Sequence, residues 1–249
     1  MKGKRLSLED RLIISLDTSR KSDVIRLCKK IQGKVSTLKL GLELIYSVGL
    51  EVIDTVKSFG YKVMLDAKLL DIPNTVEGAI KAIGDLGVSA VTIHTLGGSQ
   101  MLEKAREILE KQAKSRAKFR PLLFGVTILT SLDNSDLKTL GFKGDFYHSV
   151  LNLTEIALDA GIDGVICSPK EVEAVRKKFG TDFYIATPGI RLPEDTGGDQ
   201  KRISTPQEAI SKGADFIIVG RPITASKDIS RTIDSYLEKI ERAHESCLK

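Results

Sequence analysis

Three charged residues lie close together in an otherwise apolar segment, "LDAKLLDIPNT" (residues 65–75): Asp66, Lys68 and Asp71. Burying an unpaired charge is costly, so their presence requires a reason. Carboxylates beside an amine favour its protonated form, and a fixed ammonium can stabilise developing negative charge and then deliver a proton. The alternative is an ordinary layer of salt bridges without a catalytic role, and the spacing leaves both interpretations open.

Asp66 and Lys68 are two residues apart in a β-rich run, and alternate side chains of a strand share a face. We therefore expect both side chains to point the same way. Lys39 lies at the equivalent level of the preceding β-rich run and is expected to be their neighbour.

Asp71 is three residues beyond Lys68, out of step with the period of two, so it is expected in a loop after the strand. Pro73 reinforces that end of the strand. Asn74 or Thr75 is then expected to cap the following helix, "TVEGAIKAIGDLG".

A second group of polar residues lies near the end of the sequence. The segment 186–202, "ATPGIRLPEDTGGDQKR", is rich in Gly and Pro, and "IIVGRPIT" carries Gly220 and Arg221 at the end of a β-rich run. Backbone N–H groups freed by glycine, together with a guanidinium, bind phosphoryl oxygens well. We predict a phosphate site here, with a mobile loop around 191–202 that grips the phosphate.

Short apolar runs alternate with amphipathic helical patterns along the whole sequence, which is typical of a parallel sheet. Helical patterns include 99–114 and 226–245, and a glycine expected to adopt positive φ follows each of several helices, at positions 60, 87, 161, 180 and 213. The expected strands are 12–17, 37–44, 62–69, 90–96, 122–129, 164–168, 183–189 and 215–221.

Eight strands in 249 residues favour a (β/α)₈ TIM barrel of the α/β class, with residues 1–249 forming a single domain. No GxGxxG follows the first strand, which disfavours a dinucleotide-binding fold. In a barrel, the loops after strands seven and eight are the usual place for a phosphate.

The composition, with 41% hydrophobic and 29% charged residues, excludes a disordered chain. The net charge of +5 is modest, and its densest cluster, 111–120, has no interleaved aromatic residues, so we interpret it as solvated surface and expect no nucleic-acid partner. Three scattered cysteines and no long apolar segment indicate a cytoplasmic protein without a membrane partner.

Other reactive residue types are interpreted as structural. His94 could act as a general base, but a hydrogen-bonded structural histidine is preferred because no Ser or Cys motif lies nearby. His148 and His244 are expected at the surface. Cys167 is expected to be a small buried hydrophobic residue, since no charge pattern would lower its pKa.

The segment 65–75 matches the D-x-K-x-x-D-I-x-N-T pattern of the orotidine 5′-phosphate decarboxylase family, and the sequence is similar to that family from about Arg11 to Ile223. "LIISLD", "LKLGLEL", "VTILTS", "ATPGIR" and "VGRPIT" recur there in the same order. The resemblance implies a lyase of pyrimidine biosynthesis that converts orotidine 5′-monophosphate to uridine 5′-monophosphate and CO₂ without metal or organic cofactor.

The resemblance also implies roles for individual residues. Lys39, Asp66 and Lys68 would form a charged array in one subunit, with Lys68 as the proton donor. Asp71 and Thr75 would complete that array from the other subunit of a homodimer.

For the substrate, the resemblance implies that Asp17 holds the ribose hydroxyls and that Thr130, together with or in place of Ser131, holds the pyrimidine edge. Further implied substrate contacts, several of them around the phosphate, are Lys39, Ile72, Pro188, Arg191, Gln200, Gly220 and Arg221.

The main alternative is a barrel similar to hexulose-phosphate synthase or keto-gulonate-phosphate decarboxylase, which uses the same D-x-K-x-x-D frame with Mg²⁺ and an enediolate. Pro73 and the "NT" that follows favour the nucleotide enzyme. A barrel that only binds anions or a partner would leave Lys68, between its carboxylates, unexplained.

Overall fold

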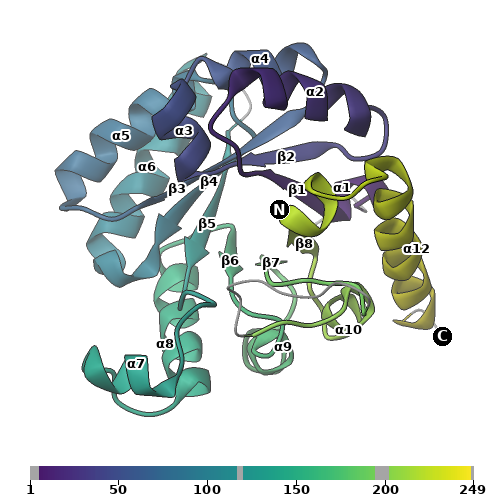
Figure 1. Cartoon of the computed structure of the whole chain (residues 1–249). Helices are drawn as coiled ribbons and strands as arrows, with labels where there is room; N and C mark the ends of the chain where they lie inside the picture. The colour runs from purple at the N-terminus through teal and green to yellow at the C-terminus, as the bar shows by residue number, and fades with distance from the viewer. Residues whose placement is uncertain (1–5, 117–119, 194–201, 248–249) are drawn as a thin grey trace.

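The computed structural model describes residues 6–116, 120–193 and 202–247. Eight parallel strands form a closed barrel in chain order, and the last strand pairs with the first (Figure 1). This confirms the predicted (β/α)₈ TIM barrel. The strands are β1 Leu12–Leu16, β2 Thr37–Leu40, β3 Lys62–Leu69, β4 Ala90–His94, β5 Leu122–Val126, β6 Gly164–Ile166, β7 Tyr184–Thr187 and β8 Phe216–Val219.

Helices surround the barrel (Figure 1). They are α1 Leu8–Arg11, α2 Lys21–Ile31, α3 Leu42–Val48, α4 Val52–Ser58, α5 Pro73–Asp85, the 3₁₀ helix η1 Thr95–Gly97, α6 Gly98–Arg116, α7 Asn134–Thr139, α8 Phe146–Asp159, α9 Val172–Phe179, α10 Pro206–Ser211, α11 Arg221–Thr224 and α12 Ile229–Cys247. Within the described ranges, no helix is long and apolar enough to cross a membrane.

Side chains along each strand point alternately into the barrel and out toward the helices. Ile13 of β1 belongs to the apolar cluster inside the barrel, whereas its neighbours Leu12 and Ile14 pack against the helices. Phe124 and Phe216 meet edge to face inside the barrel, with ring centroids 6.0 Å apart. This apolar filling occupies the interior, so polar side chains that point inward lie at the carboxyl ends of the strands.

Two predictions about local structure are wrong. Residues 37–44 do not form one strand, because β2 ends at Leu40 and α3 begins at Leu42; a short apolar run cannot by itself distinguish strand from helix. Asn74 and Thr75 do not cap α5, because the helix already begins at Pro73. Its N-cap residue is Ile72, whose side chain forms no capping hydrogen bond. Proline suits the first helical position because the N–H that it lacks would have no helical partner there. The five glycines predicted after helices do adopt positive φ.

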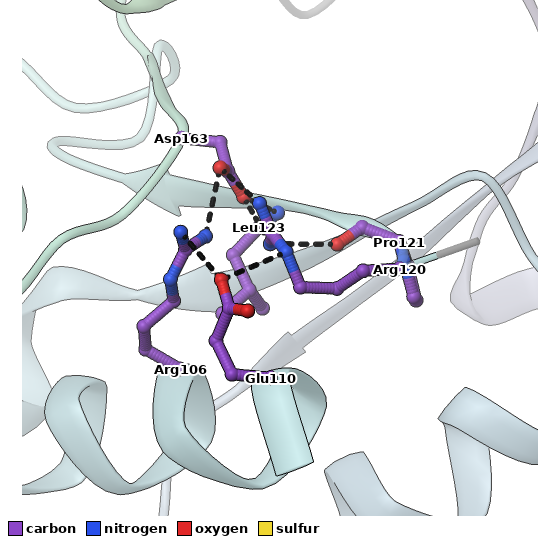
Figure 2. A network of polar contacts seen from close by, with 6 residues as sticks. All are labelled: Arg106, Glu110, Arg120, Pro121, Leu123 and Asp163. Carbon is purple, nitrogen blue, oxygen red and sulfur yellow. Dashed lines mark hydrogen bonds and ion pairs between the residues drawn. The ribbon is translucent and has the colours of Figure 1, made fainter. Parts of the chain in front are cut away.

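The prediction that the basic segment 111–120 is solvated surface is wrong for Arg120, which is buried. Its guanidinium forms a two-pronged ion pair with Asp163, with N–O distances of 2.6 and 2.7 Å (Figure 2). Arg106 of α6 contacts the same carboxylate at 2.8 Å, and Glu110 of α6 binds both arginines. The interpretation as solvated surface fails because sequence alone does not reveal a partner more than 40 residues away.

This network lies at the amino-terminal end of the barrel, since Asp163 directly precedes β6 and accepts the backbone N–H of Leu123 in β5 at 2.8 Å. Burial alone would raise the pKa of Asp163. The hydrogen bonds from Arg120 and from the backbone of Leu123, together with the charges of Arg120 and Arg106, outweigh that effect, so the pKa lies below its usual value. Because the chemistry of such barrels takes place at the opposite, carboxyl end, we assign this network a role in stability.

Asp163→Asn should lower the free energy of unfolding by about 3 kcal/mol at pH 7, because it leaves buried Arg120 without its main counter-charge. Urea denaturation would measure this. Because the folded-state pKa is depressed, the stabilisation is present above the ordinary carboxyl pKa and is lost as the pH falls through the folded value.

The difference between the wild type and Asp163→Asn should therefore shrink below about pH 4. Glu155→Gln, which removes the half-exposed ion pair with Lys178, serves as the control and should change stability by less than about 1 kcal/mol. A difference that stays constant down to acidic pH would contradict a role for the Asp163 charge.

Candidate active site

A cavity of about 260 Å³ opens at the carboxyl ends of the strands. Most of the residues predicted to form the site line it, and they come from β2 and β3 and from the segments after β1, β5, β7 and β8. Those residues are Asp17, Lys39, Asp66, Lys68, Thr130, Pro188, Arg191, Gly220 and Arg221.

The centre of the cavity wall is a carboxylate shared by two ammonium groups. Lys39 Nζ lies 2.8 Å from one oxygen of Asp66, and Lys68 Nζ lies 2.9 Å from the other. The side chains of Asp66 and Lys39 are 9% and 11% exposed, whereas that of Lys68 is 34% exposed. Lys68 is therefore the member of this array that a ligand in the cavity can most readily reach.

Burial acts to raise the pKa of Asp66, but the charges of Lys39 and Lys68 and their hydrogen bonds outweigh it and lower that pKa to about 2. Asp66 is consequently ionised at neutral pH. Burial alone would disfavour the charged form, so the pairing with two ammonium groups is what allows a charge in this apolar strand.

The strand that carries this array is irregular. Leu65 pairs with Val91, but the next pair is Leu69 with Ile93, so β3 contains extra residues between them. Lys68 has a φ of 46°, in the left-handed region. The predicted regular alternation is therefore wrong between Leu65 and Leu69, although the side chains of Asp66 and Lys68 do meet as expected.

Two glycines make room for the charged side chains of Asp17 and Lys39 at the cavity. A Cβ atom on Gly220 would lie 2.9 Å from a carboxylate oxygen of Asp17, and one on Gly41 would lie 3.3 Å from Lys39 Nζ. Ser15 donates a hydrogen bond of 2.9 Å to Asp17. Ser15 also lines the cavity, and the sequence analysis did not single it out, because a serine inside a β-rich run carries no distinctive pattern.

Two arginines predicted to hold the phosphate lie at the cavity. Arg191 and Arg221 both line it, from the segments after β7 and β8. The backbone of Arg191 is fixed by a hydrogen bond of 3.0 Å from its N–H to the carbonyl of Ser204. Two arginines from the segments after neighbouring strands suit a dianionic group such as a phosphate.

Other predicted residues do not line this cavity. Asp71, Ile72 and Thr75 lie beyond the end of β3 and are exposed. Ser131 is also exposed and off the cavity wall, so of the two candidates for the pyrimidine edge, Thr130 is the one that lines it. Gln200, and most of the predicted loop 191–202, lie outside the described residues.

Arg202 is a buried residue near the cavity that the sequence analysis missed. Its guanidinium binds Glu171 at 2.6 Å and the carbonyl of Leu129 at 3.0 Å, and it lies 4.1 Å from the ring centroid of Phe146. These contacts join the segments after β5, β6 and β7. Nothing in the sequence distinguishes this arginine from the solvated lysine and arginine residues expected in a polar loop.

The remaining reactive residues agree with their structural interpretation. His94 is buried, its Nδ1 accepts the N–H of Leu96 at 3.4 Å, and burial together with the charge of Lys68 lowers its pKa. Burial strongly raises the pKa of the Cys167 thiol. His148 is exposed, whereas His244 is half-buried rather than fully at the surface. Among the described residues, no three His, Cys, Asp or Glu side chains cluster as a metal site.

Comparison with known proteins gives a consistent result over nearly the whole chain. The sequence model of the orotidine 5′-phosphate decarboxylase / HUMPS family matches residues 10–236. The chain is 42% identical to the orotidine 5′-phosphate decarboxylase of Carboxydothermus hydrogenoformans, over 94% of this chain and 97% of that protein. It is 38% identical to the protein of the same name from Actinobacillus succinogenes, over 94% and 100% of the two chains.

Solved structures agree with the sequence comparison. The crystal structure of orotidine 5′-phosphate decarboxylase from Lactobacillus acidophilus superposes with a TM-score of 0.82 at 35% identity, covering 93% of this chain and 99% of that one. Fold, sequence and the residues of the cavity thus point to one group of proteins. The chain belongs to the orotidine 5′-phosphate decarboxylase / HUMPS family.

Proposed function

We propose that this chain decarboxylates orotidine 5′-monophosphate to uridine 5′-monophosphate and CO₂, the reaction of pyrimidine biosynthesis for which its relatives are named. The observation that carries the proposal is the ionised Asp66 between the ammonium groups of Lys39 and Lys68. Arg191 and Arg221 on the wall of the same cavity supply cations for the phosphate.

Loss of CO₂ from C6 of the pyrimidine leaves an electron pair in an sp² orbital perpendicular to the ring π system. The ring cannot delocalise that pair, so the site must stabilise a localised negative charge. The Lys68 ammonium, fixed against Asp66, stabilises the charge electrostatically and then donates a proton to C6. Lys39 holds the other oxygen of Asp66 and keeps the carboxylate in place.

In our proposal Asp66 also repels the carboxylate of the substrate, and loss of CO₂ relieves that repulsion. This effect is secondary to stabilisation of the carbanion in our proposal. Binding energy from the remote phosphate offsets the repulsion. Asp17 binds the ribose hydroxyls and Thr130 the pyrimidine edge, with Ser131 as the alternative. Pro188, Gly220 and Gln200 complete the substrate contacts, within one catalytic domain whose segment 191–202 holds the phosphate.

We further propose a cytoplasmic homodimer in which Asp71, Ile72 and Thr75 of one subunit complete the site of the other. Their exposure in the single chain supports this arrangement. Large apolar side chains are also exposed after three neighbouring strands, β2, β3 and β4, as a dimer interface requires. They are Leu42, Tyr46, Leu70, Ile72 and Leu96.

The direct test uses purified protein with orotidine 5′-monophosphate and a strong chelator of divalent metals, and follows the change in ultraviolet absorbance as the carboxylate is lost. We expect full turnover in the chelator. Turnover that requires added Mg²⁺, or none with this substrate, would instead support the enediolate chemistry of the magnesium-dependent barrels.

Lys68→Ala should reduce kcat at least about 10³-fold with substantial substrate binding retained, because it removes the proton donor and the charge that stabilises the carbanion. Lys62→Ala, at the exposed amino-terminal end of the same strand, is the matched control and should leave kcat unchanged. Near-normal turnover by Lys68→Ala would exclude Lys68 as the acid.

Arg221→Ala should raise KM and lower kcat together, with kcat/KM down about 100-fold.

Mixing two inactive variants tests whether each active site is built from both subunits of the dimer. Lys68→Ala and Asp71→Ala should each be inactive alone, but random pairing after joint refolding should restore about a quarter of the wild-type activity, since half of the dimers are mixed and each has one intact site. A mixture of Lys68→Ala with Asp66→Asn is the control, because both changes lie in the same chain's half of the site. Activity no higher in the first mixture than in the second would refute a shared site.

A further inference from the structure

We propose that Thr92 is a positioning residue of this active site, whose single hydroxyl fixes both the Asp66 carboxylate and the backbone of Lys68. Thr92 lies in the middle of β4 and is fully buried. Its Oγ1 donates to an oxygen of Asp66 at 2.9 Å and accepts the backbone N–H of Lys68 at 2.8 Å. The inference rests on the proposed function and assigns a role in it to a residue that neither touches the substrate nor lines the cavity.

The first part of the argument concerns the backbone. Among the described residues, Lys68 is the sole non-glycine residue with positive φ, a strained conformation that persists only where its surroundings enforce it. The register between β3 and β4 skips the residues between Leu65 and Leu69, so the N–H of Lys68 falls where the regular pairing is interrupted. A buried N–H requires a partner, and the hydroxyl of Thr92 provides it.

The second part concerns the carboxylate. One oxygen of Asp66 binds Lys39, while the other accepts both the hydroxyl of Thr92 and the ammonium of Lys68. The hydroxyl has one proton, which it uses toward Asp66, and its lone pair receives the N–H of Lys68, so both bonds form at once. Thr92 thereby sets the distance between the backbone of Lys68 and the anion that holds its side chain.

This arrangement explains how Asp66 and Lys68, which are two positions apart in one strand, form a close ion pair. The left-handed turn at Lys68 brings its ammonium back to Asp66, and the hydroxyl of Thr92 holds the turn. A displacement of about 1 Å in a reacting group costs about 100-fold in rate, so the positioning contribution should be visible in kcat.

Thr92→Val tests the proposal because valine keeps the shape and removes the hydroxyl. We expect kcat to fall about 10- to 100-fold. The KM and the dissociation constant of uridine 5′-monophosphate should change less than about threefold, since the arginines that hold the phosphate are untouched. Thr92→Ser, which restores a hydroxyl, should recover kcat to within a few-fold of the wild type.

Thr127→Val is the matched control. Thr127 is equally buried, but its hydroxyl donates to the carbonyl of Ile166 at 2.9 Å rather than to a charged group. It should leave kcat nearly unchanged. A kcat of Thr92→Val equal to the wild type, or of Thr92→Ser as low as that of Thr92→Val, would overturn the proposal. Should Thr92→Val fail to fold, Thr92→Cys, a weaker donor, takes its place with an expected loss between those of Ser and Val.

A crystal structure of Thr92→Val separates this inference from the proposed function. We expect Lys68 to leave the left-handed region, or its Nζ to move away from Asp66 beyond hydrogen-bonding distance. An unchanged Lys68 would refute the positioning role even if the wild-type enzyme decarboxylates the nucleotide. If Lys68 changes in the variant and the wild type is inactive toward orotidine 5′-monophosphate, the positioning role is supported and only the proposed reaction is refuted.

Discussion

The sharing of the Asp66 carboxylate between Lys39 and Lys68 is the interaction on which the site depends. Burial alone would raise the pKa of the Asp66 carboxylate, and the charges of the two lysines outweigh that effect. The opposite charges stabilise one another, because each ammonium lies within 3 Å of a carboxylate oxygen. The barrel makes the arrangement possible, since it brings residues of β2 and β3 side by side above an apolar interior.

The architecture could be predicted from the sequence because the alternation of β-rich and amphipathic segments is repeated along the whole chain. Strand ends could not be placed, since apolar residues continue past the hydrogen-bonded ladder. Residues 37–44 illustrate this: Leu42 and Leu44 fit a strand by composition, yet they begin α3. Leu44 is buried and Leu42 exposed, a distinction that comes only from packing against the rest of the chain.

Of the site, the charged residues could be predicted and their supporting residues could not. Asp66, Lys39 and Lys68 are conspicuous because charge is rare in a buried strand. Thr92 is inconspicuous, because threonine is common in strands and its hydroxyl acquires a role only through the irregular register of β3. Arg120 and Arg202 are buried by partners distant in sequence, which a solvated-surface interpretation of basic segments cannot anticipate.

The two ends of the barrel use buried charge in different ways. At the amino-terminal end, Arg120 forms two hydrogen bonds with Asp163, and its side chain is only 5% exposed. Its charge is therefore compensated within the protein and is not accessible to a ligand. At the carboxyl end, Asp66 has two cations, and the side chain of Lys68 keeps a third of its surface accessible. Two carboxylates, Asp17 and Asp66, and four cationic side chains, Lys39, Lys68, Arg191 and Arg221, line the cavity, which leaves a net positive charge there. That positive charge can bind an anionic ligand. The strained backbone at Lys68 directs its ammonium toward the cavity, and this strain lowers the stability of the fold.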